Sequence, residues 1–250
     1  MSDISKLSSG YEILEFEELD STMLTLKDLA LSGCNIKTVV IAKRQKKGRG
    51  RHGRVWESPE GNLYFSFLRE AEKNLNNNIF APVFIVALSL AHSIIDASEK
   101  KIIPKIKWPN DILVNKSKIA GILIEYINIK NKKDLLNIGI GVNIISNPKK
   151  SIYPATNLQK ENVNISPKML LNIFLNQFDK INKIYKVDGI EKIFDMWYDL
   201  GHKIGESVSV KVKDKKIIGT FNGLSKEGSL LIINENGIEE VILAGDVFII

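Results

Sequence analysis

The chain has 250 residues, of which 44% are hydrophobic and 26% are charged, a composition that is typical of a globular protein and excludes a disordered or fibrous one. The single cysteine, Cys34, excludes an internal disulfide framework and suits a reducing cytosol, so a cytoplasmic protein is expected. The N-terminal residues lack the apolar core of a signal peptide, and the most apolar stretch, residues 79–95, is too often interrupted by polar residues to cross a bilayer.

The positive charge of the chain is concentrated in one segment. There are 35 Lys and Arg against 29 Asp and Glu, which gives a net charge of +6. Residues 43–54, KRQKKGRGRHGR, hold seven of these basic residues and no acidic one, so the rest of the chain is close to neutral. A protein that tracks nucleic acid usually spreads its charge over a face. A single cationic loop therefore favours a compact anionic ligand, with an RNA-binding loop as the alternative.

In chain order, apolar residues recur with the periods of strands and helices up to about residue 200. Asp20 or Ser21 can cap the first helix, and Gly33 can end it. A turn at NKSK joins two of the strands into a hairpin. The predicted elements are a strand (11–18), a helix (20–33), strands (37–43 and 62–68), a buried helix (78–99), strands (105–115, interrupted at Pro109, 119–129 and 134–145) and two helices (166–185 and 188–200).

The pattern of apolar and turn residues changes after Glu206. Short strands alternate with turn residues such as Lys-Asp and Asn-Glu-Asn-Gly, a pattern typical of a small all-β barrel. The sequence therefore predicts an α+β domain over residues 11–202 and a β-barrel over residues 203–250. Residues 1–10 are expected to be an N-terminal tail that is too short to form a domain.

The stretch GRGRHGRVW, residues 48–56, combines flexible backbone with positive charge. Glycine permits conformations that turn successive backbone N–H groups toward an anion. Arginine adds paired donors for phosphate or carboxylate, and Trp56 offers a flat face to a purine. The pattern is neither a Walker loop nor a dinucleotide-binding fingerprint, because the intervening residues are basic and a strand follows. It favours a site for a nucleotide phosphate or a mixed anhydride, with an exposed basic loop as the alternative.

Two further stretches place polar groups among strand residues. In KWPNDILVNKSKIAGILIE, Gly121 interrupts an apolar strand, which indicates close approach by a ligand or another backbone. In GIGVNI, residues 139–144, two glycines and Asn143 share one face of a strand. Solvated turn residues and a bulged strand stay open as alternatives for the two stretches. The polar residues of the first stretch are Lys107, Asn110, Asp111 and Lys118.

Together, GRGRHGRVW, KWPND, KIAGILIE and GIGVN, in this order and at these separations, strongly resemble the motifs of the biotin protein ligases. The resemblance runs from about residue 11 to the C-terminus. It implies an α+β catalytic domain with a mixed sheet, the biotin/lipoate ligase fold that is related to class II synthetases, followed by an SH3-like barrel. It also implies that biotin and ATP, with Mg²⁺, give biotinyl-5′-adenylate and pyrophosphate, and that the biotinyl group then passes to a lysine of a biotin carboxyl carrier protein of the acetyl-CoA carboxylase type.

The resemblance also implies which partners to expect. Some members of the family carry an N-terminal helix-turn-helix domain and repress transcription. The chain has no room for such a domain, so it resembles the ligase-only class. The expected partner is a carrier domain, with neither DNA nor a membrane, and both a monomer and a homodimer stay open.

Residues that match the family motifs take their expected roles from the resemblance. In relatives the residue after Thr22 is commonly Asn, and here it is Met23, which we expect to pack into the helix core instead. No metal ligand is assigned, because Mg²⁺ is expected to arrive with ATP. The biotin-binding residues are expected to be Ser21, Thr22, Gln45, Arg49, Gly50, Arg51, Lys118 and Gly121. The ATP- and adenylate-binding residues are expected to be Arg54, Trp56, Lys107, Asn110, Gly141 and Asn143. Catalytic roles are expected for Arg51, Arg54, Asp111 and Lys118.

The reaction that the resemblance implies sets requirements that these residues can meet. Attack of the biotin carboxylate on the α-phosphorus of ATP brings two anions together, so Lys118, Arg51 and Arg54 are expected to supply fixed positive charge. The glycine-rich loop is expected to order over the adenylate and shield it from water, and Asp111 to orient the incoming amine. The competing functions are a lipoate protein ligase, a nucleic-acid-binding module and a biotin-binding relative without turnover.

Overall fold

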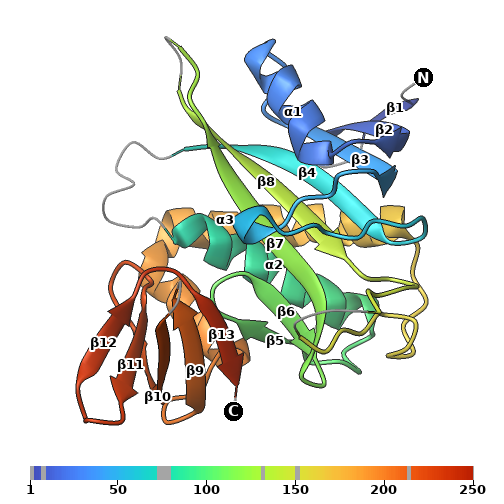
Figure 1. Ribbon diagram of the computed structural model, residues 1–250. Coiled ribbons are helices and arrows are strands. Elements are labelled where there is room, and N and C mark those ends of the chain that lie inside the picture. Colours follow the sequence, from blue (N-terminus) through green and yellow to red (C-terminus); the bar gives the residue numbers. More distant parts are fainter. Residues whose placement is uncertain are drawn as a thin grey trace.

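The computed structural model describes residues 3–6, 10–71, 80–130, 133–149, 153–212 and 215–249. They form an eight-stranded mixed sheet with helices on both faces, and a separate five-stranded antiparallel sheet at the C-terminal end (Figure 1). The predicted α+β fold class is thereby confirmed. Within these ranges, none of the helices combines the length and the hydropathy that crossing a bilayer requires.

The large sheet has the strand order β1-β2-β3-β4-β8-β7-β6-β5. β2 (Glu12–Leu19) and β3 (Thr38–Gln45) are parallel, because α1 (Thr22–Leu31) crosses over between them. All other neighbouring strands are antiparallel. The remaining strands are β1 (Asp3–Lys6), β4 (Leu63–Glu70), β5 (Lys105–Lys107), β6 (Asp111–Val114), β7 (Ser117–Ile127) and β8 (Leu135–Val142).

Two local features of the sheet bear on the sequence predictions. The N-terminal tail predicted over residues 1–10 includes an edge strand, β1, which pairs with β2. A strand of four residues is too short to show a period-two pattern, so the sequence did not reveal it. The predicted turn at NKSK is present between β6 and β7, where Asn115 and Lys116 both have positive φ angles, of 49° and 62°, as a two-residue hairpin turn requires.

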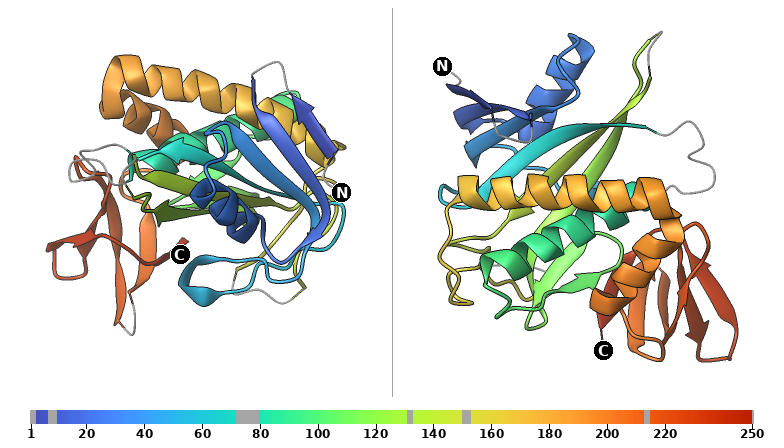
Figure 2. Two further views of the ribbon diagram at one scale, coloured as in Figure 1. Left: turned by 90° about the horizontal axis from the view of Figure 1, so that it is seen from above. Right: turned by 180° about the vertical axis from the view of Figure 1, so that it is seen from behind.

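The helices α2 (Ala81–Ala97) and α3 (Pro167–Leu200) cover the face of the large sheet opposite α1 (Figure 2). α2 has apolar residues on almost every side, and it is accordingly buried between the sheet and α3. Its two buried serines satisfy their hydroxyls within the helix, since Ser89 donates to the Ile85 carbonyl and Ser93 to the Ser89 carbonyl, both at 2.6 Å. Residues 78–79 of the predicted helix 78–99 lie outside the described residues.

α3 begins at Pro167, directly after Ser166, whose hydroxyl accepts a hydrogen bond from the Met169 N–H at 3.3 Å. Gly189 interrupts the helix with a φ angle of 80°, a conformation that other residues rarely adopt. The two helices predicted at 166–185 and 188–200 therefore correspond to the segments of α3 on either side of Gly189.

The C-terminal sheet has the order β12-β11-β10-β9-β13 and packs against the β5–β6 turn and α3 through two tryptophans. Trp108, in the turn between β5 and β6, is fully buried and donates its indole N–H to the Gly228 carbonyl at 3.0 Å. Trp197, near the end of α3, is also fully buried and lies against Phe221 of β10. This packing brings the start of β13 close to the β5–β6 turn. The strands are β9 (Ser207–Val212), β10 (Lys215–Leu224), β11 (Leu230–Asn234), β12 (Glu239–Ile242) and β13 (Asp246–Ile249).

Candidate active site

A cavity of about 310 Å³ lies on the α1 side of the large sheet, under the loop that joins β3 to β4. Of the predicted site residues, all but one line it. The exception is Lys107, which is only 4% exposed and contacts Asp111 from the protein interior. The predicted residues that line the cavity are Ser21, Thr22, Gln45, Arg49, Gly50, Arg51, Arg54, Trp56, Asn110, Asp111, Lys118, Gly121, Gly141 and Asn143.

One end of the cavity consists of hydroxyl and amide groups. The side-chain oxygen of Gln45 accepts hydrogen bonds from the backbone N–H of Thr22 at 2.9 Å and from its hydroxyl at 3.2 Å. The amide nitrogen of Gln45 donates to the Ser58 hydroxyl at 3.0 Å, and the Thr22 hydroxyl lies 2.8 Å from that of Ser66. Ser21 occupies the N-cap position of α1, but its side chain makes no capping hydrogen bond and lines the cavity instead. This end is therefore a neutral array of donors and acceptors.

The floor of the cavity is formed by two side chains that lie directly on the sheet. A Cβ atom on Gly139 would lie 2.5 Å from the Met23 sulfur, and one on Gly141 would lie 2.5 Å from the Trp56 indole. Gly121 faces Gly141 across β7 and β8, and its Cβ would lie 2.9 Å from the same indole. The close approach that the sequence predicted at Gly121 is thus made by a side chain and not by another backbone. Met23 packs on the sheet rather than within its own helix.

The glycine-rich loop is folded back on itself over this floor. The backbone N–H of Trp56 donates to the Gly48 carbonyl at 2.9 Å, and that of Gly50 donates to the Arg54 carbonyl at 2.7 Å. Gly48 cannot be replaced without movement, because a Cβ there would lie 2.2 Å from the Trp56 carbonyl oxygen. His52 is exposed at the tip of the loop.

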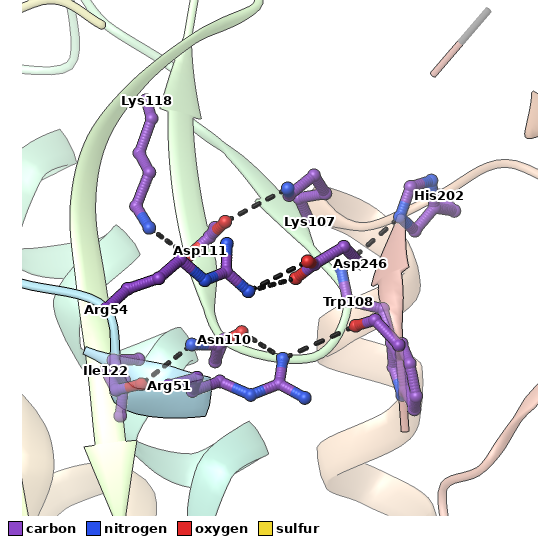
Figure 3. A network of polar contacts seen from close by, with 11 residues as sticks. Arg51, Arg54, Lys107, Trp108, Asn110, Asp111, Lys118, Ile122, His202 and Asp246 are labelled. Atoms are coloured by element: carbon purple, nitrogen blue, oxygen red, sulfur yellow. Dashed lines mark hydrogen bonds and ion pairs between the residues drawn. The ribbon is translucent and has the colours of Figure 1, made fainter. Parts of the chain in front are cut away.

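Most of the positive charge of residues 43–54 is paired locally. Six of the seven basic side chains lie within 4 Å of a carboxylate. Arg51 is the exception among the described ion pairs, and it donates to the side-chain oxygen of Asn110 at 2.9 Å (Figure 3). The pairs are Lys43–Glu17, Arg44 with Glu18 and Glu60, Lys46–Glu18, Lys47–Asp20, Arg49–Glu125 and Arg54–Asp246. The loop is consequently less cationic than its sequence alone indicates.

The opposite end of the cavity is built around a buried carboxylate. Asp111 is 6% exposed, with one oxygen 2.6 Å from the Lys118 ammonium and the other 3.0 Å from the Lys107 ammonium (Figure 3). Burial alone would raise the pKa of Asp111, but Lys118 and Lys107 outweigh this effect and hold the pKa below its ordinary value. Burial lowers the pKa of Lys107, whose ammonium lies 3.6 Å from the centre of the Tyr153 ring. Burial also lowers the pKa of Arg51, which stays charged.

Sequence reasoning missed three residues at this site: Glu125, Tyr153 and Asp246. Arg49 and Glu125 are joined by two contacts, of 2.6 and 3.0 Å, and Arg54 lies 2.8 Å from both oxygens of Asp246. Glu125 ends the stretch KIAGILIE, so its place on β7 was open to prediction. Asp246 follows Arg54 by 192 positions and comes from the second sheet, so no local pattern could connect the two.

Asn143 has a structural partner at the wall of the cavity. It is 2% exposed, and its side-chain N–H donates to the Thr156 carbonyl at 3.0 Å. This bond ties the end of β8 to the segment around Thr156. That Asn143 also binds ATP or the adenylate, as the resemblance implies, stays a prediction.

The arrangement suits one kind of ligand particularly well. A neutral polar group fits the hydroxyl and amide end, and an anion fits the end that holds Arg51, Arg54 and Lys118. The indole of Trp56 and the backbone at two glycines form an apolar surface between them. The cavity can therefore hold an amphipathic molecule together with a phosphate.

Comparisons with known proteins extend over both sheets. A model of the Biotin/lipoate A/B protein ligase family matches residues 15–143, and a model of the biotin protein ligase C-terminal domain matches residues 203–249. The chain is 30% identical over 217 residues to the chloroplastic biotin–protein ligase 1 of Arabidopsis thaliana, covering 80% of this chain but only 57% of the relative. It is 28% identical over 238 residues to the biotin–[acetyl-CoA-carboxylase] ligase of Paracoccus denitrificans, covering 92% of this chain and 97% of that one.

A solved structure is similar over nearly its whole length. The biotin protein ligase from Aquifex aeolicus, in complex with biotin and ATP, matches with a TM-score of 0.80 and 30% identity, covering 95% of this chain and 99% of that chain. The first family model alone spans more than half of the 250 residues. From the matched sequence, the shared fold and the matching C-terminal domain it follows that the chain belongs to the biotin/lipoate A/B protein ligase family, and within it to the biotin protein ligases.

Proposed function

We propose that this protein is an ATP-dependent biotin–[biotin carboxyl carrier protein] ligase. The observation that supports this most strongly is the single cavity that joins a neutral hydrogen-bonding end to a cationic end. Biotin has a neutral ureido head and a carboxylate tail, so the two ends of the cavity match the two ends of this substrate. ATP supplies the phosphates for the cationic end, and the solved relative from Aquifex aeolicus is a complex with biotin and ATP.

In the proposed binding mode, the ureido group lies at Ser21, Thr22 and Gln45. A ureido group presents one carbonyl acceptor and two N–H donors, and hydroxyl groups can serve either of them. Thr22 and Gln45 are already oriented by hydrogen bonds to each other, so little ordering is needed when the substrate binds. The carboxylate of biotin then extends over the indole of Trp56 toward Lys118, whose ammonium lies 5.2 Å from the centre of that ring.

In the first proposed step, a carboxylate oxygen of biotin attacks the α-phosphorus of ATP. A new oxygen–phosphorus bond forms, and the bond to pyrophosphate breaks. Both reactants are anionic, so the step requires positive charge that is fixed in place before the reaction. Lys118 and Arg51 supply this charge, and holding the carboxylate in line with the leaving pyrophosphate accounts for much of the rate.

In the second proposed step, the neutral amine of a carrier lysine attacks the acyl carbon of biotinyl-adenylate. An amide bond forms, the bond between the acyl carbon and the phosphate oxygen breaks, AMP leaves as the anion, and the proton of the amine passes to water. Asp111 orients the amine by accepting a hydrogen bond. Its lowered pKa makes this carboxylate a weak base, which favours orientation over proton removal.

Mg²⁺ is proposed to enter the site with the triphosphate. The described ranges hold no group of three or more His, Cys, Asp and Glu residues that could bind a metal ion. Bound Mg²⁺ would neutralise charge on the phosphate oxygens. The acidic residue nearest to the cations, Asp111, already lies between two lysines.

The loop is proposed to protect the adenylate from water. Arg51 is the loop arginine whose described contacts include no carboxylate, and it donates instead to Asn110 at 2.9 Å across the cavity. Replacing it with glycine (Arg51→Gly) removes this closure, so biotinyl-adenylate should escape and label nearby lysines at random. Retention of the adenylate as tight as in the wild type would contradict this role.

One assay tests the proposed function as a whole. The protein is incubated with biotin, MgATP and a biotin carboxyl carrier domain, and the carrier is analysed by intact mass and peptide mapping. The expected result is one biotinyl group on one lysine. A parallel reaction with lipoate should give no product, whereas a lipoyl group on a lipoyl domain would replace this proposal by a lipoate ligase.

A further inference from the structure

The contact between Arg54 and Asp246 connects the cationic end of the cavity to the C-terminal sheet (Figure 3). One guanidinium nitrogen of Arg54 lies 2.8 Å from each oxygen of the carboxylate. On the basis of the proposed function, we propose that Asp246 is a positioning residue. Its carboxylate binds Arg54 in the way that a phosphate of a nucleotide would. ATP must then displace the carboxylate in order to bind Arg54, and the C-terminal sheet sets the affinity of the ligase for nucleotide.

The chemistry of the two anions supports this exchange. A carboxylate and a phosphate both present two anionic oxygens to a guanidinium group, and arginine binds both with similar geometry. Arg54 and Asp246 both line the cavity, so a ligand that fills the cationic end can reach their contact. The described ion pairs give Arg54 no other acidic partner, so a phosphate that takes this arginine takes it from Asp246.

Of the three acidic residues that line the cavity, Asp246 is the one suited to this role. Glu57 is exposed on the loop, and Asp111 is held by two lysines that would keep it in place. Asp246 faces a single loop arginine and comes from a different sheet. Removing its carboxylate therefore frees Arg54, while Arg51 keeps its hydrogen bond to Asn110.

The C-terminal sheet holds Asp246 at a fixed position. The indole of Trp108 donates to the Gly228 carbonyl at 3.0 Å, and a Cβ on Gly228 would lie 2.9 Å from Phe84 of α2, so the C-terminal sheet is closely packed against the β5–β6 turn and α2. Next to Asp246, the Gly245 carbonyl lies 3.5 Å from a guanidinium nitrogen of Arg51. Gly245 and Asp246, at the start of β13, thus contact both arginines. A phosphate has to compete for Arg54 with a carboxylate that belongs to the C-terminal sheet and not to the glycine-rich loop.

The decisive experiment compares ATP binding by the wild-type protein and by Asp246→Asn. Asparagine keeps the shape of the side chain and removes its charge. Isothermal titration with MgATP in the absence of biotin should give a Kd about three- to tenfold lower for the variant, the size expected for loss of a partly exposed ion pair that competes with the ligand. The Kd for biotin, titrated without ATP, should stay within twofold. Asp246→Ser should tighten ATP binding in the same direction.

A matched control comes from the same sheet. Glu240 of β12 lies 3.7 Å from Lys215, so Glu240→Gln also removes one paired carboxylate from the C-terminal sheet, away from the cavity. This variant should bind ATP like the wild type, which would exclude a general effect of net charge. An equal gain in Glu240→Gln would overturn the proposal.

The remaining outcomes separate this inference from the proposed function. If the wild type binds ATP and Asp246→Asn binds it equally or more weakly, Asp246 does not compete with phosphate and this inference is wrong, whereas the ligase function stands. If the wild type itself binds no ATP, the proposed function fails and this inference fails with it. Tighter binding in both Asp246 variants, with an unchanged Kd for biotin, is the result that supports it.

Discussion

The two ends of the cavity are built in different ways. The neutral end is made of hydrogen bonds among Thr22 at the start of α1, Gln45 of β3 and Ser66 of β4, which are close together in one part of the fold. The cationic end is made of charged side chains from a loop, a hairpin and a second sheet, which meet across the cavity. The first end can form once its own strands are paired. The second depends on how distant parts of the chain pack together.

This difference assigns different tasks to the two ends. Neutral hydrogen bonds are directional, and leaving one buried partner unsatisfied costs about 1 to 3 kcal/mol, so the neutral end is suited to selecting one substrate. Charges act over longer distances and stabilise the charge that develops during a reaction. We therefore expect substitutions at the neutral end to change the affinity for biotin, and loss of a fixed cation at the cationic end to change mainly the rate.

The largest effect is expected at the cationic end, for Lys118→Met. Lys118 lies 2.6 Å from Asp111 and lines the cavity, and methionine keeps most of its length without the charge. The rate of biotin-dependent ATP–pyrophosphate exchange should fall about 100-fold or more, since fixed charge at a reacting phosphate contributes on that scale. Lys168→Met, at an exposed lysine that pairs with Glu15, should leave the rate unchanged. A loss of less than about threefold in Lys118→Met would refute a catalytic role for Lys118.

A smaller and different effect is expected at the neutral end, for Thr22→Val. Valine has the shape of threonine but cannot bond to Gln45 and Ser66, which lie 3.2 and 2.8 Å from the hydroxyl. The KM for biotin should rise about tenfold, the loss expected for a buried hydrogen bond, while kcat and the KM for ATP stay within about twofold. Thr25→Val, at a half-buried threonine of the same helix that does not line the cavity, is the control. Equal changes in the KM values for both substrates would remove the distinction between the two ends.

Most of the fold and one part of the site could be predicted from the sequence. Strand alternation, the NKSK turn and the division of α3 into two helices are local features that periodicity and turn chemistry revealed, although the predicted break lies between residues 185 and 188 and the observed one at Gly189. The residues expected to bind ligand mostly lie in short motifs at the ends of strands. Because these motifs come from neighbouring strands, pairing in the large sheet brings them to one cavity.

What the sequence could not indicate depends on contacts between distant segments. Asp246 reaches Arg54 only because the C-terminal sheet packs on Trp108. Nothing in the sequence around Asp246 indicates that its partner is an arginine of a distant loop. Likewise, the pairing of the loop lysines and arginines with acids of β2 and β7 could not be read from a segment that contains no acid. Charge counted along a sequence therefore overstated the charge that the folded loop presents.

A comparison of two neighbouring glycines on β8 sharpens the contrast further. Alanine at Gly141 would place a Cβ 2.5 Å from the rigid indole of Trp56, whereas alanine at Gly139 would meet the flexible side chain of Met23 at the same distance. Gly141→Ala should move the indole off the sheet, raising the KM for ATP several-fold and shifting tryptophan fluorescence to longer wavelength. Gly139→Ala should change neither by more than about twofold. Similar shifts in the two variants would show that the flexibility of the displaced side chain does not matter.

The packing of the second sheet, on which the cationic end depends, should also be sensitive to pH through His202. This imidazole is fully buried, and its Nε2 lies 3.3 Å from the backbone nitrogen of Trp108 (Figure 3). Its Nδ1 lies 2.7 Å from the Glu206 carboxylate. Because Nε2 accepts that bond, it carries no proton, and Nδ1–H donates to Glu206. Burial lowers the pKa of His202 below its ordinary value of 6.5, and Glu206 offsets this only in part.

The smallest predicted effect follows from the sign of this shift. Because the folded state holds His202 neutral, the unfolded chain takes up the proton first as the pH falls, so stability is complete above about pH 6.5 and declines below it. One such group contributes at most about 1.4 kcal/mol per pH unit. Urea midpoints measured from pH 7.5 to 5.5 should therefore fall less in His202→Gln than in the wild type, whereas His52→Gln, at the exposed loop imidazole, should follow the wild type. Parallel curves for His202→Gln and the wild type would mean that the contact between the sheets does not depend on a neutral His202.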